Sequence, residues 1–253
     1  MAATVTALTI APVKGMRVVP VDELELGQAG PVGDRAFVLV DADGALVKTT
    51  RTPKLLQVEP SWHAATNTLG LRFPDGREVA AVPEPGERAT TAFYNGRPVT
   101  GALVGGPLAE ALSAHLGRPV QLLALDPRQT GADDAPVTLM STASLVALGE
   151  ALEGGVPDPR RFRMTITIDG SAAWEEHGWS GREVRVGDVT LRVVEPVPRC
   201  VVTTRDPDQG RQDAPILKAL ADLRGKDDVT FGVWCEVARP GIVRVGDAVA
   251  TPA

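Results

Sequence analysis

The sequence predicts a mainly β protein of the α+β class, with an N-terminal β domain followed by a β-barrel that carries a few short helices. Short apolar runs alternate with polar residues along most of the 253 residues, and turn signals separate them. Only a few segments have helical spacing. A stretch rich in Pro, Gly and Asp, Asp126–Pro136, has the composition of a linker. We therefore expect two domains, at residues 1–130 and 131–253.

The first half is expected to consist of strands and one helix. Turn signals at residues 41–44 and 74–76 predict two β-hairpins, over residues 36–48 and 68–82. Leu108, Ala111, Leu112 and Leu116 have helical spacing, so residues 106–117 should form a helix that stops at a glycine. The predicted strands are Thr4–Ile10, Val21–Leu26, Ala36–Val40, Leu55–Val58, Thr68–Phe73, Arg77–Val82 and Val120–Leu125.

The second half shows the same strand patterns with two helical segments. Ser141 or Thr142 is a candidate N-cap for a helix over Ala143–Leu152, because both hydroxyls can accept from free N–H groups. A second helix is expected over Ala214–Leu223. The predicted strands are Arg163–Ile168, Glu183–Val186, Thr190–Glu195, Val201–Thr204, Phe231–Val237 and Ile242–Val245.

Composition narrows the possible functions. The net charge is −6, which disfavours nucleic acid as a partner, since such proteins usually present a basic surface. No apolar run approaches the ~20 residues that span a bilayer, so no membrane association is expected. The first residues lack the basic start and apolar core of a signal peptide, and a cytoplasmic location is therefore expected.

The chain has two cysteines in contrasting surroundings. Two are too few for a disulfide framework or for an iron–sulfur cluster in this chain, and no zinc-ligand spacing is present. Cys200 follows Arg199 after a bend stiffened by Pro196 and Pro198, and a neighbouring guanidinium favours a thiolate. A small buried, inert thiol is the alternative there. Cys235 lies in an apolar run, where packing is the favoured interpretation.

Three basic residues adjoin turns or strand starts. Lys14 precedes Gly15, which leaves the backbone open to a ligand, Arg35 precedes a predicted strand, and Arg163 opens one. Each could contact an anion. Considered one at a time, each is better explained as a solvated loop charge.

Several segments in one order resemble a known family. The run VVEPVPRCVVTTRDPDQG resembles the signature of the MOSC domain, and the N-terminal half resembles the β-barrel domain that precedes it in many members. PVKG, GDRAFVLVDADG, LMSTASLVAL, RFRMTITIDG and FGVWCEVARPGIVRVGDAV extend the similarity over nearly the whole chain. By pattern, the chain is similar to the mitochondrial amidoxime-reducing components and their bacterial counterparts.

The resemblance implies a molybdenum cofactor with Cys200 as the metal ligand, a soft thiolate suited to such a centre. It implies that cations surround the phosphate of the pterin, and that the start of a helix adds polar contacts. It also marks positions where this chain departs from many relatives: Gly15 replaces a serine, Thr165 an asparagine and Trp234 a tyrosine. The cofactor-binding residues implied are Lys14, Gly15, Arg35, Ser141, Thr142, Arg163, Thr165, Pro198, Arg199 and Trp234.

The function implied is a molybdenum-dependent reduction of N-hydroxylated or N-oxygenated small molecules. No flavin or nicotinamide motif is visible, so electrons are expected from a separate electron-transfer protein. The alternative is a non-redox carrier of the cofactor or a sulfur-transfer module. Sulfurase relatives join this domain to a pyridoxal-phosphate domain, but direct binding of pyridoxal phosphate is not expected here.

Overall fold

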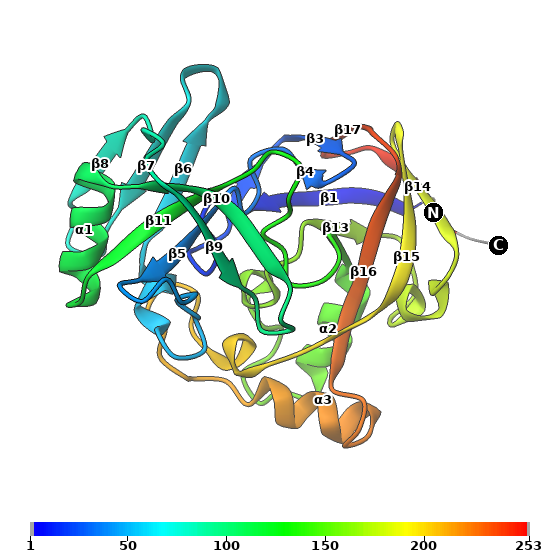
Figure 1. Cartoon of the computed structure of the whole chain (residues 1–253). Coiled ribbons are helices and arrows are strands. Elements are labelled where there is room, and N and C mark those ends of the chain that lie inside the picture. Colours follow the sequence, from blue (N-terminus) through cyan, green and yellow to red (C-terminus); the bar gives the residue numbers. More distant parts are fainter. Residues whose placement is uncertain (1–2, 252–253) are drawn as a thin grey trace.

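The computed structural model describes residues 3–251, and a seven-stranded barrel forms its C-terminal part (Figure 1). Pairing of β13 with β1 closes the barrel, and β2 (Val19–Val21) extends the sheet beside β1. In spatial order the barrel strands are β13 (Ile166–Asp169), β12 (Val137–Ser141), β16 (Thr230–Arg239), β15 (Val189–Pro198), β14 (Glu183–Val186), β18 (Ala248–Ala250) and β1 (Ala3–Ile10).

Buried and exposed residues alternate along these strands, and the buried side chains that fill the barrel are mostly aliphatic. Val189, Leu191 and Val193 of β15 are fully buried, whereas Arg192 and Val194 between and beside them are exposed. Val137 and Cys235 are directly opposite each other in β12 and β16, and both belong to this core. The interior is therefore a packed apolar core that leaves functional groups to the rim and outer face.

The N-terminal part combines two sheets and a helix (Figure 1). Helix α1 (Gly106–Leu116) packs against β11 and β8, and it buries Leu108 and Leu112 in the shared core. The four-stranded sheet has the order β5 (Phe37–Asp41), β11 (Val120–Leu125), β10 (Pro98–Val104) and β9 (Arg88–Ala92). The three-stranded sheet has the order β6 (Glu59–His63), β7 (Thr68–Arg72) and β8 (Glu78–Ala81).

Strand pairings connect the first residues of the chain to the part that follows residues 126–136. The first strand, β1, pairs with β13 and β18 and is therefore part of the barrel. A third small sheet pairs β3 (Glu23–Gly27) with β4 (Gly30–Pro31) and β17 (Gly241–Arg244). The N-terminal segment thus crosses into the C-terminal part before the sheets of the N-terminal part begin, which fixes the two parts against each other.

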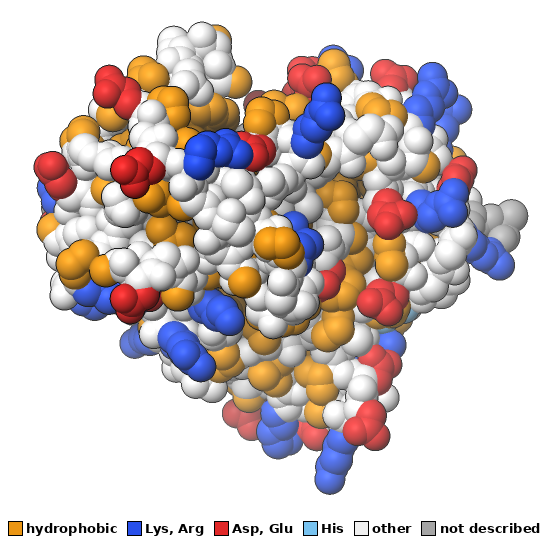
Figure 2. Space-filling model, viewed as in Figure 1, with side chains coloured by type: hydrophobic (Ala, Val, Ile, Leu, Met, Phe, Trp, Pro, Cys, Tyr) orange, Lys and Arg blue, Asp and Glu red, His pale blue; other side chains and the backbone are white. Residues whose placement is uncertain are grey.

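Two further helices cover one end of the barrel. Helix α2 (Thr142–Glu150) and α3 (Ile216–Arg224) pack together around Leu148, Phe162 and Phe231, and the two phenyl rings are stacked at 4.1 Å. The predicted N-cap is confirmed for Ser141, because its Oγ accepts from the Ser144 N–H at 3.0 Å. Figure 2 shows acidic and basic side chains interspersed over the displayed face.

The mainly β class and both predicted hairpin turns are confirmed, whereas two predicted strands are wrong. Residues 55–58 lie mostly in a 3-10 helix, η1 (Pro53–Gln57), in which proline at the first position presets a helical φ. Residues 201–204 form another, η5 (Val201–Thr204), because the Cys200 carbonyl accepts from the N–H and hydroxyl of Thr203 at 3.1 and 3.0 Å.

The expected strand start at residue 163 is also wrong. Arg163 has a φ of 56° and ends the short helix η3 (Pro159–Phe162), so β13 begins only at Ile166. The strands that were not predicted include β6, β9 and β10 and the barrel strands β12 and β18. Pro60 in β6 and Pro98 in β10 weaken the strand pattern, and β6 tolerates its proline as an edge strand.

Candidate functional site

Cys200 lies immediately after β15, where the barrel sheet loses its regular pairing. The register of β15 against β16 shifts around Pro196 and Pro198, as expected where residues lack a backbone donor. Cys200 itself is exposed and forms the N-cap of η5. The bend expected from the prolines therefore presents the thiol to solvent. The alternative of a small buried thiol does not hold for this cysteine.

The side chain of Arg199 turns inward from the same bend. Its Nε donates to the Phe231 carbonyl at 2.9 Å, and its Nη1 donates to the Phe162 carbonyl at 3.0 Å. Its Nη2 also contacts Met164 Sδ at 2.7 Å. Burial lowers the pKa of this guanidinium and the Cys200 sulfur opposes the shift, but an arginine stays charged at neutral pH. Arg199 thus anchors the backbone that carries Cys200.

Arg163 brings a second half-buried cation close to the thiol. Its left-handed backbone directs Nη1 to the Met16 carbonyl at 2.6 Å, across the boundary between the two parts of the chain. Its Nη2 is buried and has no hydrogen-bond partner among the described residues. Burial and the nearby Arg35 lower the pKa of Arg163, while Asp34 and Cys200, among others, raise it. The unpartnered Nη2 is a donor available to an anionic ligand.

Lys14 and Arg35 complete a group of three cations. Lys14 Nζ donates to the Gly131 carbonyl and to Asp133 Oδ1, both at 2.8 Å. Burial lowers the pKa of Lys14 to about 8, opposed by Asp133 and assisted by Arg35 and Arg163. Arg35 Nη1 pairs with Asp34, and its Nη2 donates to the Arg163 carbonyl at 3.3 Å. The segment 126–136 is therefore more than a connection, since it supplies two partners of Lys14.

The remaining predicted residues divide according to their contacts. Ser141 is fully buried, and its hydroxyl contacts that of Ser144. The backbone N–H of Ser141 and the hydroxyl of Ser144 both donate to the Glu176 carboxylate. Burial raises the pKa of Glu176. The Thr142 hydroxyl donates to Asp169. Thr165 is buried and exchanges hydrogen bonds with Thr138, whose partner across the sheet is Trp234.

Contacts and charge effects therefore bring together Lys14, Arg35, Arg163, Arg199 and Cys200. The hydroxyls of Ser141, Thr142 and Thr165 are instead engaged with neighbouring protein groups, and Pro198 is exposed opposite Thr230. The site thus has one exposed thiol beside several cations, an arrangement that suits an anionic group carrying a thiophilic metal.

Some residues of this region had no signal in the sequence. Thr49 lies directly against Gly15, and its Oγ1 occupies the space of a potential side chain there. Asp34 and Asp133 pair with the predicted cations, but both appeared only as turn and linker residues. Their roles depend on contacts between distant segments, which local patterns do not encode.

Within residues 3–251, no cluster of three or more His, Cys, Asp or Glu side chains could hold a metal ion by itself. A metal at Cys200 would therefore have to arrive with other ligands. Over the same residues, no helix is long and apolar enough to cross a membrane.

Comparisons with known proteins agree with this architecture. Residues 126–250 match the model of the MOSC domain, and residues 2–114 match that of the MOSC N-terminal beta barrel domain. Mitochondrial amidoxime-reducing component 1 from Xenopus laevis is 30% identical, over 97% of this chain and 81% of its own length. The human protein of that name is 27% identical, over 97% and 82%.

A molybdenum cofactor sulfurase from Danio rerio is also similar, at 27% identity over 91% of this chain but only 31% of its own length. The two domain models match in this order, and the amidoxime-reducing relatives cover nearly the whole chain. This chain belongs to the MOSC family, in the group whose members carry a MOSC N-terminal beta barrel domain ahead of the MOSC domain.

Proposed function

We propose that this protein is a molybdenum-cofactor-dependent oxidoreductase that reduces N-hydroxylated or N-oxygenated small molecules. The observation that carries the proposal is the exposed Cys200 thiol next to Arg163, whose buried Nη2 has no partner among residues 3–251. The names of the amidoxime-reducing relatives support the substrate class.

The residues present fit such a cofactor. Cys200 would supply the thiolate ligand, and Lys14, Arg35 and Arg163 would provide positive charge and donors to its anionic groups. Arg199 would hold the Cys200 backbone in position through the Phe162 and Phe231 carbonyls. The chemistry that this cofactor supplies when bound is oxygen-atom and electron transfer at molybdenum.

The protein's own part in the reaction is electrostatic. The cations around Cys200 would attract the anionic groups of the cofactor and hold it beside the thiol. With a pKa of about 8, Lys14 holds a proton on Nζ at neutral pH and keeps its charge. Breaking an N–O bond reductively consumes protons, so a site that retains cations at neutral pH suits this reaction class.

A separate electron-transfer protein is part of the proposal. Cys200 and Cys235 are too few for a four-cysteine iron–sulfur cluster, and the buried Cys235 is inside the barrel. Reduction of benzamidoxime should therefore require a flavoreductase and an iron–sulfur or haem partner in addition to NADH. Turnover with this chain and NADH alone would contradict this part of the proposal.

The alternative is a carrier of the cofactor or of sulfur. The similarity to the zebrafish molybdenum cofactor sulfurase favours it, as does the exposure of Cys200, which leaves the thiol open to modification. A carrier and a reductase would both contain molybdenum but differ in turnover.

Elemental analysis and a reduction assay on the same preparation test the proposed function. We expect close to one molybdenum per chain and reduction of benzamidoxime once a competent donor is supplied. Molybdenum without turnover by any donor would favour the carrier. No molybdenum after expression in a cofactor-producing host would refute both.

A further inference from the structure

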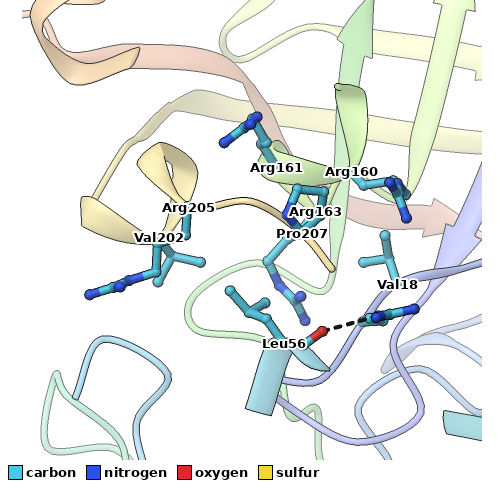
Figure 3. A pocket seen from close by; sticks show the side chains of 9 residues that line it. Val18, Leu56, Arg160, Arg161, Arg163, Val202, Arg205 and Pro207 are labelled. Carbon is cyan, nitrogen blue, oxygen red and sulfur yellow. Dashed lines mark hydrogen bonds between the residues drawn. The ribbon is translucent and has the colours of Figure 1, made fainter. Parts of the chain in front are cut away.

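A narrow pocket beside the thiol is lined by five arginines. Figure 3 shows Arg163 in the middle of this pocket, with Arg160 and Arg161 from the same short segment and Arg205 from the segment after η5. Arg17 also lines it and donates to the Leu56 carbonyl at 3.1 Å. Val202, two residues after Cys200, forms part of the wall.

Three of these arginines are neutralised by carboxylates. Arg160 and Arg17 both contact Asp208, at 2.9 and 3.3 Å, and Arg161 pairs with Asp213 at 2.8 Å. The carboxylates around the three are those of Glu59, Asp158, Asp208 and Asp213. These ion pairs form part of the pocket wall, and the three arginines in them therefore contribute little net charge to the pocket.

Arg163 and Arg205 differ from the other three, because neither forms an ion pair within residues 3–251. Arg163 Nη1 and Arg205 Nη1 are each satisfied by a backbone carbonyl, of Met16 at 2.6 Å and of Gly210 at 2.9 Å. Arg163 Nη2 and Arg205 Nε are buried and have no hydrogen-bond partner among the described residues. One pocket therefore combines two cations without carboxylates and two donors without acceptors.

Buried donors without partners are costly, and a charged donor more so than a neutral one. Water would satisfy the hydrogen bonds but would bring no negative charge to the two guanidinium groups. An oxyanion supplies both the acceptor lone pairs and the negative charge, and guanidinium groups match the geometry of carboxylate and phosphate oxygens.

We infer that this pocket binds an oxyanion, a phosphate or carboxylate group, between Arg163 and Arg205. The pocket lies next to Cys200. The two sources that we consider for the oxyanion rest on the proposed function. One source is the phosphate of the cofactor, and the other is an anionic group on the substrate. Arg205 thereby becomes a binding residue, a role that the sequence did not indicate.

Calorimetric titration with inorganic phosphate at fixed ionic strength tests the inference on the full chain. Wild type is compared with Arg205→Gln, which removes the charge, and with Arg205→Lys, which keeps the charge but loses the Nε donor. Arg211→Gln is the matched control, since Arg211 is exposed in the same loop and does not line the pocket. Thermal unfolding of each variant checks the fold, and the lysine variant serves should the glutamine variant not fold.

Phosphate should bind the cofactor-free chain, and Arg205→Gln should weaken binding about ten-fold or more, with Arg205→Lys in between. Arg211→Gln should bind like wild type. Titration of the molybdenum-loaded chain separates the sources: lost phosphate binding identifies the cofactor's phosphate, and retained binding identifies a substrate group. No phosphate binding to wild type, or equal effects of Arg205→Gln and Arg211→Gln, would overturn the inference. The molybdenum content, measured separately, decides the proposed function independently of this result.

Discussion

The side chain of Thr49 fills the space that a side chain on Gly15 would need. A β-carbon built on Gly15 would collide with Thr49 Oγ1 and come within 3.2 Å of Leu55 Cδ1, and Gly15 also has a φ of +88°. The Thr49 hydroxyl lies 3.4 Å from the Gly15 carbonyl, next to Lys14. The family resemblance implied a serine hydroxyl at position 15, and here the hydroxyl of a residue 34 positions away occupies that space.

This relationship predicts that Gly15→Ser is harmful although it introduces the residue that the family resemblance implies at this position. The substitution introduces a steric clash and a strained backbone conformation, which together should cost about 2 kcal/mol or more of unfolding free energy. Gly15→Ser combined with Thr49→Ala should recover part of this loss, because the clashing hydroxyl is removed. Thermal unfolding of the two variants and of Thr49→Ala alone measures the coupling. Additive effects would show that the two side chains do not compete for space.

The same pair shows what the sequence could and could not reveal. Alternation of apolar and polar residues predicted the class and most strands, because strands such as β14 and β3 bury one face and expose the other. Pairing of β1 with β13 joins residues 158 or more positions apart, and no local pattern specifies such a partner. Thr49 and Arg205 escaped notice for the same reason: each matters through a neighbour that only the folded chain supplies.

The family resemblance was most informative for site residues whose roles depend on one another. Lys14, Arg35 and Arg163 were ambiguous individually, but in the structure Arg35 and Arg163 lower the pKa of Lys14, and Arg35 lowers that of Arg163. Ser141 had the right local role as an N-cap, but its hydroxyl is buried with Ser144. The family motifs therefore identified the region of the candidate site, whereas the hydrogen bonds in the structure determine which side-chain groups remain available to a ligand.

The two cysteines should respond differently to replacement by serine. Cys200→Ser exchanges an exposed soft ligand for a hard, poorly ionised one, so molybdenum content and activity should fall while the unfolding temperature stays near wild type. Cys235→Ser places a hydroxyl inside the apolar barrel, where burial already raises the pKa of the thiol to about 12. It should lose about 1–3 kcal/mol of stability and keep its molybdenum. An active Cys200→Ser protein would contradict the ligand assignment.

Cofactor retention should depend on pH through Lys14. Its pKa of about 8 means that Nζ is charged below that pH and neutral above it, so its attraction for an anion is present at pH 7 and lost as pH rises through about 8. Bound anions raise this pKa somewhat and shift the loss upward. Molybdenum per chain after dialysis from about pH 7 to pH 9.5 measures the effect. In Lys14→Arg, which stays charged, this step should disappear, and a step of the same size in both proteins would assign it to another group.

Arg199 should matter through its geometry more than through its charge. The guanidinium satisfies two backbone carbonyls, of Phe162 and Phe231, which come from η3 and β16. Arg199→Lys keeps the charge, but a single ammonium cannot reproduce the planar fork, and one buried carbonyl is left without a donor. We expect a loss of about 1–3 kcal/mol in unfolding free energy. Molybdenum content should also fall, since the backbone at Cys200 is no longer fixed.

Arg192→Lys is the matched control for this change. Arg192 lies on β15, the strand that ends just before Arg199, is exposed, and pairs with Glu183 at 3.3 Å, an interaction that lysine can replace at little cost. Thermal unfolding and elemental analysis of both variants separate the two roles of Arg199. If it contacted the cofactor's phosphate only as a positive charge, Arg199→Lys would keep both its stability and its molybdenum. Loss of molybdenum together with lowered stability, against an unaffected Arg192→Lys, would establish that Arg199 acts by positioning Cys200.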